Sequence, residues 1–405
     1  KAGMTASKWI SSYTFDPKYT QKNFNFDVFS FQPGILDEKA NIVYIKKSAQ
    51  LGITECFCRW GLWFIATHQK PTIIYIMPTM TDISSFSAHR FMPILQAIEM
   101  KIPMLEEVNN AMQKKILGGF IYFKGTKGTS SAISIPADAL IHDEYNFSDI
   151  NTITQYNSRL ENSPHKKKRI FSTPTFTDAG IDELFKKGSQ AHFLHKCPKC
   201  GHYNNLHYSD IINLNPLRLI SETFVCKRCD RPLDKMKTKT RWVHKFPDRE
   251  EKSYFISQVQ APHKSPTMIF DSLKQYSHNL QEGINFVLGE TYDSPKNPFT
   301  YKSLLEATGT HTSKDKSYLT SIGVDTGEYC HICVTEQSGD HIYIIHQEEV
   351  PSKRAKNTLA NLCDRFNPIQ INIDAMPLMV FNEEVRDNIF TETYDIWLRS
   401  IVTNF

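Results

Sequence analysis

Two pairs of cysteines have the spacing of a tetrahedral metal site. Cys197 and Cys200 form one Cys-x-x-Cys segment, and Cys226 and Cys229 form a second one after an interval of 25 residues. Thiolates at this spacing fold two tight turns around one Zn²⁺ ion, and four sulfur ligands leave no open coordination position. The sequence therefore predicts a structural zinc site, and four unrelated core thiols are the weaker alternative. Three nearby histidines are less favoured substitute ligands: His195, His202 and His207.

A second segment has the composition of a phosphate-binding loop. It consists of Lys47, Ser48, Ala49, Gln50, Leu51, Gly52, Ile53 and Thr54. A β-branched run at 41–45 precedes it and a helical pattern at 54–67 follows. In that setting, backbone N–H groups and the N-terminus of a helix would face the phosphates of a nucleotide. Gly52 would allow the tight turn, and the Thr54 hydroxyl would bind Mg²⁺.

The cation of this loop is displaced from its usual place. Ile53 stands where a lysine normally precedes the threonine. We expect Lys46 and Lys47, at the start of the loop, to supply the ammonium group from the other side. Taken alone, the segment is better explained as a plain strand–turn–helix connection.

An acidic pair further along the chain favours the phosphate-binding interpretation over the plain connection. Asp143 and Glu144 end an apolar strand that we predict at 139–142. Beside a bound triphosphate, Asp143 would hold Mg²⁺ through water and Glu144 would polarise the attacking water. Acidic pairs at strand ends are often only helix caps. The loop and the acidic pair in this order nevertheless favour nucleotide hydrolysis.

The elements that must position these residues alternate between strand and helix. We predict strands at 41–45, 72–77, 139–142 and 170–173, with a helix at 54–67. This order is typical of a parallel sheet covered by helices on both faces. The expected fold class is α/β, a phosphate-loop NTPase sheet with a zinc-ribbon insertion.

The C-terminal part begins a second α/β unit. Three strands, a helix at 352–366 and a further strand place Asp325 on the first strand and Asp374 on the fourth. This order resembles the ribonuclease-H-like fold, in which the two carboxylates would share Mg²⁺ or Mn²⁺ for phosphodiester cleavage. A complete centre needs a third acid, for which Asp387 and Asp395 are available. We therefore expect the sequence either to stop inside this domain or to omit disordered stretches of it.

Charge and composition limit the partners. Between Lys196 and Lys245 there are eleven Lys or Arg against four Asp or Glu, whereas the whole chain carries only +4. Such a basic module indicates a polyanion partner or a solvated face.

The overall composition excludes several classes of protein. With 40% apolar and 22% charged residues, the 405-residue chain is neither disordered nor fibrous. No apolar run approaches the roughly 18 residues of a membrane span. Nine cysteines, an odd number, favour a reducing compartment.

With these motifs in order, the sequence resembles the large terminase subunit of tailed phages, in its lambda-type (GpA-like) branch. The match runs from about residue 31 to residue 374. The matching segments are the loop at 47–52, Met77-Pro78-Thr79 followed by Arg90 and Pro93, Lys124-Gly125 leading to Asp143-Glu144, Ser172-Thr173-Pro174, and Asn285-Phe286-Val287-Leu288-Gly289.

The resemblance implies a function and its partners. It implies ATP-driven packaging of viral double-stranded DNA into a procapsid, coupled to cutting of the DNA concatemer. The implied partners are the small terminase subunit, the portal and further copies of the chain in a ring, within the host cytoplasm and away from membranes. Gln32 would contact adenine. Gln50 replaces an arginine that many relatives place in the loop. The transition-state charge would then be met by Lys46, by Lys47, by an arginine of a neighbouring subunit or, less favourably, by Arg90.

We expect four segments along the chain. These are a phosphate-loop ATPase domain at 1–190, a four-cysteine zinc ribbon at 191–241, the remainder of the ATPase domain with a lid and linker at 242–315, and the incomplete nuclease domain at 316–405. Two other functions stay open: a zinc-ribbon DNA translocase or helicase-like ATPase without nuclease activity, and a DNA-binding protein without enzymatic activity.

Overall fold

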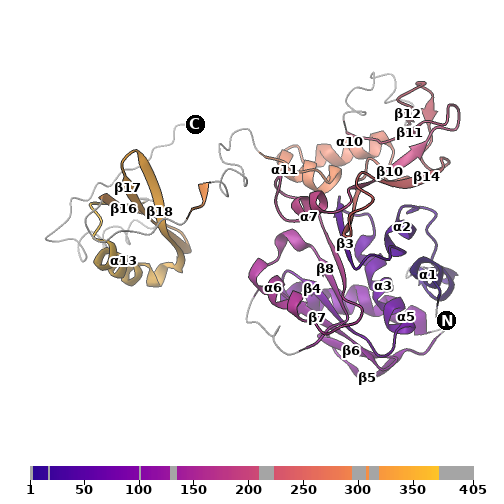
Figure 1. The fold of residues 1–405 in the computed structure, drawn as a ribbon, viewed down its shortest axis with the longest axis horizontal. Coiled ribbons are helices and arrows are strands. Elements are labelled where there is room, and N and C mark those ends of the chain that lie inside the picture. The colour runs from indigo at the N-terminus through magenta and orange to yellow at the C-terminus, as the bar shows by residue number, and fades with distance from the viewer. Residues whose placement is uncertain are drawn as a thin grey trace. The chain divides into compact units, whose positions relative to one another are not determined.

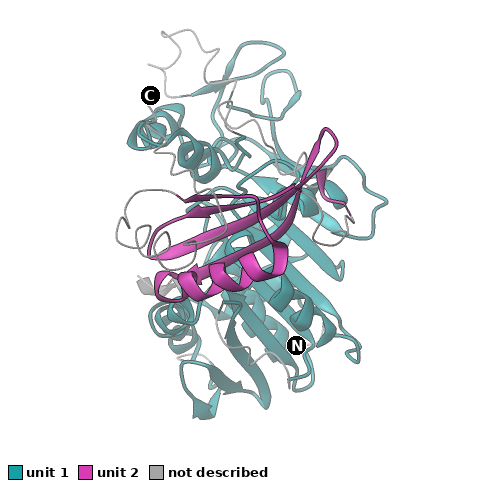
Figure 2. Ribbon diagram, turned by 90° about the vertical axis from the view of Figure 1, so that its left-hand side faces the viewer, with its two compact units in different colours: residues 1–305 teal, residues 306–405 magenta. Residues whose placement is uncertain are grey.

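The chain forms two compact units. The computed structural model describes residues 3–16, 19–99, 102–127, 135–208, 223–293, 307–309 and 319–373. The first unit comprises residues 1–305 and the second residues 306–405 (Figures 1 and 2). None of the described helices is long and apolar enough to cross a lipid bilayer.

A sheet of eleven described strands forms the centre of the first unit. Seven of its strands are parallel neighbours, in the order β10, β15, β3, β9, β8, β4, β7. In that order their bounds are Ala191–Lys196, Lys252–Ile256, Ile42–Lys47, Lys167–Ser172, Ala139–Asp143, Thr72–Met77 and Gly119–Gly125. Antiparallel strands extend both edges: β6 (Gln113–Ile116) and β5 (Leu105–Asn109) beyond β7, and β11 (Tyr203–Asn204) and β14 (Thr240–His244) beside β10.

The central strands are apolar along their whole length because helices cover both faces of the sheet. Successive side chains on a strand point to opposite faces. In β4, Ile73 and Tyr75 pack into the core beneath α3 (Ile53–Thr67) and α5 (Met92–Glu99), whereas Ile74 and Ile76 pack beneath α6 (Ile150–Ser158) (Figure 1). On the α6 face, α7 (Ile181–Lys187) covers β3 and β9. The predicted parallel sheet with helices on both faces is confirmed.

The remaining described elements of the first unit are short. They are α1 (Ala6–Tyr13), β1 (Phe15–Asp16), β2 (Tyr19–Asn23), α2 (Gln32–Leu36), α4 (Met80–Phe86), η1 (Ser87–Phe91), η2 (Tyr145–Phe147), β12 (Phe224–Val225), β13 (Pro232–Leu233), α10 (Pro266–Gln275), α11 (Leu280–Glu282) and η3 (Gly283–Leu288). The predicted zinc ribbon belongs to this unit, because β10, β11 and β14 continue the large sheet.

The second unit has its own four-stranded sheet and core. The strand order is β18 (His341–Pro351), β17 (Tyr329–Ser338), β16 (Leu319–Asp325), β19 (Gln370–Ile373), with α13 (Ser352–Phe366) packed against it. The strands β16 and β19 are parallel neighbours. Figure 2 shows α13 along the sheet of this unit.

Candidate functional site

The predicted phosphate loop connects β3 to α3 at the carboxyl edge of the parallel strands. Gln50 and Gly52 adopt left-handed backbone conformations, with φ of 59° and 69°, which turn the chain sharply into the helix. The first N–H groups of an α-helix have no partner within that helix. Together with the helix dipole, the N-terminus of α3 therefore offers hydrogen-bond donors and positive potential to an anion.

Other segments hold the loop in place from behind. The N–H of Ser48 donates to the Ile256 carbonyl at 3.0 Å, and the N–H of Ala49 donates to the Phe286 carbonyl at 2.7 Å. The Gln258 amide donates to the Ala49 carbonyl at 3.4 Å. Because these groups are already bonded, the start of the loop is preorganised, and the N–H groups of Ser48 and Ala49 are not available to a phosphate.

Gln32 also supports the loop. Its side chain is only 1% exposed, and its Nε2 donates to the Leu51 carbonyl at 2.9 Å. A Cβ atom on Gly52 would lie 3.0 Å from this nitrogen, so the close approach requires glycine. The Gln32 Oε1 atom has no partner among the described residues. Contact of Gln32 with adenine stays a prediction.

The two lysines at the end of β3 point to opposite faces of the sheet. Lys47 Nζ lies 3.0 Å from Glu144 Oε1. Lys46 Nζ lies 2.8 Å from Asp182 Oδ1 and 3.3 Å from Glu290 Oε2. The strand extends through both lysines, beyond the predicted 41–45, because the neighbouring strand β15 pairs with Lys46 and Lys47 as well. The structure thus brings Lys47, and not Lys46, to the predicted acidic pair.

Asp143 is a buried carboxylate beside the loop. It ends β8, which lies one strand away from β3 with β9 between them. Burial raises the pKa of Asp143 to about 7, and the charge of Glu144 adds to this rise. Tyr75 donates to its Oδ2 at 3.2 Å, the Thr54 hydroxyl interacts with the same carboxylate, and Oδ1 has no hydrogen-bond partner among the described residues. A carboxylate oxygen without a partner beside a threonine hydroxyl is a donor set that fits Mg²⁺.

Glu144 sits in a strained position. Its φ of 50° lies in the left-handed region, which a non-glycine residue adopts at a cost. Its Oε2 accepts a hydrogen bond from the Ser172 hydroxyl at 3.4 Å, and the N–H of Asn146 also donates to that hydroxyl. Ser172 belongs to the Ser-Thr-Pro segment, so this segment touches the acidic pair directly.

Sequence reasoning missed several supporting residues of this site. Asn146 accepts from the N–H of Ile181 at 2.7 Å and donates to the Thr175 hydroxyl at 3.0 Å, which ties the acidic turn to α7. Asp182 and Glu290 bind Lys46 from distant parts of the chain. Their contacts are long-range, and only the position of Asn146 two residues after Glu144 could have drawn attention to it.

The four predicted zinc ligands converge. The sulfur atoms of Cys197, Cys200, Cys226 and Cys229 all lie within 4.8 Å of one another. Two sulfur pairs are separated by 3.7 and 3.6 Å. Tetrahedral zinc with Zn–S bonds of about 2.3 Å separates its sulfurs by about 3.8 Å, so the cluster fits Zn²⁺.

Both cysteine turns have the same backbone form. Gly201 and Asp230, which follow the second cysteine of each pair, have φ of 74° and 54°. His195, a suggested substitute ligand, hydrogen-bonds the Gln260 carbonyl and the Thr238 hydroxyl instead. Within the described part of the chain, the cluster contains the four cysteines and no histidine.

The predicted nuclease acids are only partly described. Asp325 is exposed at the end of β16, and the pairing of β16 with β19 ends at Val324 opposite Ile373. Asp374, Asp387 and Asp395 lie outside the described residues. The described part of the second unit therefore supplies one of the two predicted metal-binding carboxylates.

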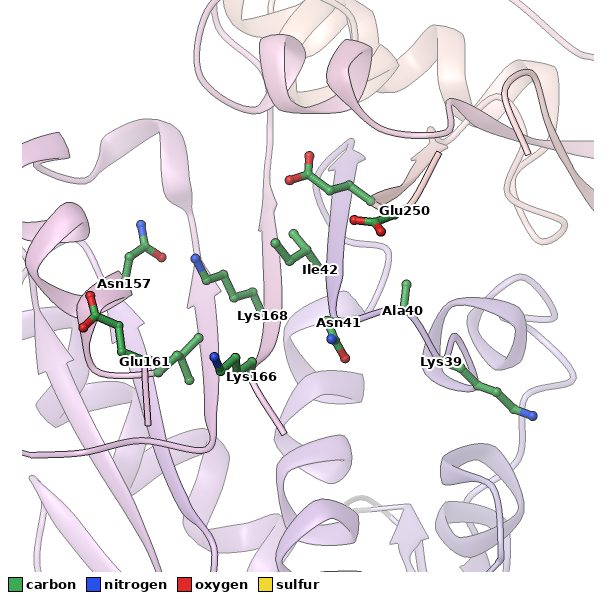
Figure 3. A pocket seen from close by; sticks show the side chains of 11 residues that line it. Lys39, Ala40, Asn41, Ile42, Asn157, Glu161, Lys166, Lys168 and Glu250 are labelled. Carbon is green, nitrogen blue, oxygen red and sulfur yellow. The ribbon is translucent and has the colours of Figure 1, made fainter. Parts of the chain in front are cut away.

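A separate cavity of about 650 Å³ lies where β3 and β9 begin, at the end of these strands opposite the phosphate loop (Figure 3). Charged side chains of both signs line it, among them Lys166, Lys168, Glu161 and Glu250. The mixed charge favours no single class of ligand, and the cavity is remote from the loop.

Residues 31–243, more than half of the 405-residue chain, match the family described as phage terminase large subunit gpA, ATPase domain. The chain belongs to this family. The matched range contains the phosphate loop, the acidic pair and the four cysteines of this terminase. The resemblance noted from the sequence is thereby confirmed, and the first unit carries the ATPase domain of a packaging motor.

Three solved terminase structures are similar to this chain at low identity. The HK97 bacteriophage large terminase is 10% identical, with a TM-score of 0.45 and coverage of 98% of this chain and 86% of that chain. The large terminase of a thermophilic bacteriophage is 11% identical, with a TM-score of 0.39 and coverage of 89% and 77%. The ATPase domain of the Thermus phage P74-26 large terminase is 11% identical, with a TM-score of 0.43 and coverage of 67% and 96%. No curated protein matches the chain.

Proposed function

We propose that this terminase hydrolyses ATP at the loop between β3 and α3 and uses the energy to move viral double-stranded DNA into a procapsid. The observation that carries the proposal is the convergence of a helix N-terminus, Lys47, Asp143 and Glu144 at one edge of the sheet. The small terminase subunit, the portal and further copies of the chain in a ring are its expected partners, in the host cytoplasm.

The site residues divide the chemistry among them. Ser48 and Ala49 would shape the start of the loop, residues 50–54 would bind the phosphates through backbone N–H groups, and Lys47 would neutralise the phosphate charge. Mg²⁺ held by Thr54 and Asp143 would supply further charge neutralisation. Gln32 would contact the adenine as well as the loop. With Gln50 in the loop, any arginine that meets the transition-state charge would come from elsewhere, such as a neighbouring subunit.

Lys47 is the ion-pair partner of Glu144 as long as no nucleotide is bound. Charge-assisted hydrogen bonds to phosphate oxygens are strong, so a bound triphosphate would compete for the Lys47 ammonium group. Once Lys47 turns to the phosphates, the Glu144 carboxylate is released to orient a water molecule and accept its proton. The contact from Ser172 would keep Glu144 oriented during this exchange.

Two further assignments complete the proposal. The four cysteines would hold a structural Zn²⁺ ion. The second unit would form a ribonuclease-H-like nuclease in which Asp325 and Asp374 share Mg²⁺ or Mn²⁺ and cut concatemeric DNA. The order of β16, β17, β18, α13 and β19, with β16 beside β19, supports this assignment.

Glu144→Gln tests the ATPase assignment. The amide keeps the shape of the side chain but cannot accept the proton, so we expect phosphate release, with and without DNA, to fall by about 100-fold or more while nucleotide binding persists. Glu161→Gln is the matched control, because Glu161 is exposed near the start of β9, away from the loop. Equal phosphate release by both variants would exclude Glu144 as the base. Absence of ATP hydrolysis in the parent protein would instead favour a DNA-binding protein without enzymatic activity.

A further inference from the structure

The four-cysteine part of the first unit is strongly and unevenly charged. We call residues 191–208 and 223–245 the zinc module. Among its described residues from Lys196 onward there are ten Lys or Arg and two Asp or Glu. A zinc ion with four thiolates contributes a charge of about −2, which leaves the module clearly cationic. The rest of the chain does not share this excess, because the whole sequence carries only +4.

The cations gather at the tips of the two cysteine turns. Lys199 lies between the first two zinc ligands and Arg228 between the last two, and both side chains are exposed. Because the four sulfur atoms lie within 4.8 Å of one another, the two tips are neighbours. Neither Lys199 nor Arg228 forms an ion pair within the described part of the chain. Both cations are therefore available to an anionic partner, whose charge each of them would attract.

An aromatic ring holds two further cations of the zinc module at the edge of the sheet. Tyr203 of β11 lies opposite Lys196 of β10. The Arg241 guanidinium lies 3.8 Å from the Tyr203 ring centroid, and Lys196 Nζ lies 5.7 Å from it. Stacking on the ring orients the guanidinium while its N–H donors stay accessible to an acceptor. Arg241 is exposed, so such an acceptor would come from a partner.

We propose that the zinc module binds the phosphate backbone of double-stranded DNA through a set of residues that we call the cationic set: Lys196, Lys199, Tyr203, Arg228 and Arg241. The inference rests on the proposed function, which makes DNA the substrate of the motor, and it names the surface that holds that substrate. Exposed Lys and Arg side chains suit phosphate contacts, which are independent of base sequence. A packaging motor requires such contacts, because it must move along any sequence.

The test measures binding of a fluorescent DNA duplex at several salt concentrations. Each lost phosphate contact lowers the slope of log affinity against log salt by about 0.9. For K199E/R228E we therefore expect an affinity at least about 10-fold weaker and a slope smaller by about 2. The control K39E/K166E makes the same charge change at two exposed lysines near the cavity of Figure 3. It should bind DNA nearly as well as the parent.

Two measurements keep the test decisive. Zinc content and DNA-free ATP hydrolysis of K199E/R228E should equal those of the parent, since neither residue is a zinc ligand or lies at the loop. If K199E/R228E loses zinc, the DNA affinity of R241Q tests the inference instead, because Arg241 lies outside both cysteine turns. DNA affinity and salt slope equal to those of the control would overturn the inference and favour an acidic protein partner. Absence of ATP hydrolysis in the parent protein would count against the proposed function, but not against DNA binding by the zinc module.

Discussion

At the scale of single residues, two neighbouring lysines have different partners. Lys47 pairs with Glu144 at the predicted site, whereas Lys46 pairs with Asp182 on the other face of the sheet. Both lysines are buried, but Asp182 is buried as well whereas Glu144 is partly exposed, and Lys46 also lies 5.2 Å from the Phe255 ring centroid. The environment of Lys46 is that of a structural ion pair, and the environment of Lys47 is that of a residue at a reaction centre.

Substitution of each lysine by methionine separates these roles. For Lys47→Met we expect a loss of at least about 100-fold in kcat/KM for ATP with a small change in Tm, because Glu144 is partly exposed and can be hydrated. For Lys46→Met we expect a loss of about 2 kcal/mol in unfolding free energy, because the buried Asp182 then keeps only Lys186 as its cationic partner among the described residues. Steady-state kinetics and thermal unfolding of both variants check this. A reversal of the two effects would assign the phosphate role to Lys46.

The raised pKa of Asp143 predicts a pH dependence of metal use. A protonated carboxyl group does not bind Mg²⁺, and burial raises the pKa of Asp143 to about 7. As the pH falls below 7, we therefore expect the Mg²⁺ concentration for half-maximal ATP hydrolysis to rise by about 10-fold per pH unit. Above pH 7 the requirement should level off. A Mg²⁺ requirement that stays constant between pH 5.5 and 7 would show that Asp143 is not a determinant of metal binding.

At the scale of elements, a buried turn at 257–261 joins the zinc module to the phosphate loop. On the side of the module, Lys235 donates to the Val259 carbonyl at 2.8 Å, and His195 lies 2.8 Å from the Gln260 carbonyl. On the side of the loop, Gln258 donates to the Ala49 carbonyl. Val259 also shares a hydrophobic core with the zinc ligands Cys197 and Cys226 and with Val287 of η3.

Removal of zinc should therefore loosen the nucleotide site. Cys226→Ser deprives the cluster of one ligand, and because metal binding supplies folding energy we expect the zinc module to lose order locally. Nucleotide affinity, measured with a fluorescent ATP analogue, should weaken several-fold, and hydrogen exchange at 48–52 should accelerate. The control Cys333→Ser changes a half-buried cysteine in the second unit. Zinc loss without any change in nucleotide affinity would show that the turn does not connect the two sites.

At the scale of the whole molecule, the two units have separate sheets and separate hydrophobic cores. ATP hydrolysis and DNA cutting would then be chemically independent. Asp325→Ala should abolish the metal-dependent nicking of plasmid DNA and leave the rate of ATP hydrolysis unchanged. The control Asp340→Ala removes another exposed carboxylate of the same unit, in the turn between β17 and β18. Unchanged nicking in Asp325→Ala would show that Asp325 is not part of the nuclease centre, whereas absence of nicking in the parent protein would favour a translocase without nuclease activity.

Sequence by itself determined the local features of this protein. Strand and helix positions follow from the spacing of apolar residues, which is why α13 has the predicted bounds and β4 agrees with the predicted strand. The four-cysteine cluster was also predictable, because a Cys-x-x-Cys turn places two thiols within four residues and a tetrahedral site needs only two such turns. The same holds for the phosphate loop and the acidic pair as motifs.

Tertiary structure decided which residues meet. Lys47 and Glu144 are 97 positions apart, and Lys46 and Asp182 are 136 apart, so no local pattern could assign each lysine to its carboxylate. The pKa of Asp143 depends on burial beneath strands and helices that are distant in sequence. The support of the loop by Gln258 and Phe286 is likewise long-range. Spacing along a chain specifies the conformation of a segment, whereas the partners of a side chain depend on which segments the core brings together.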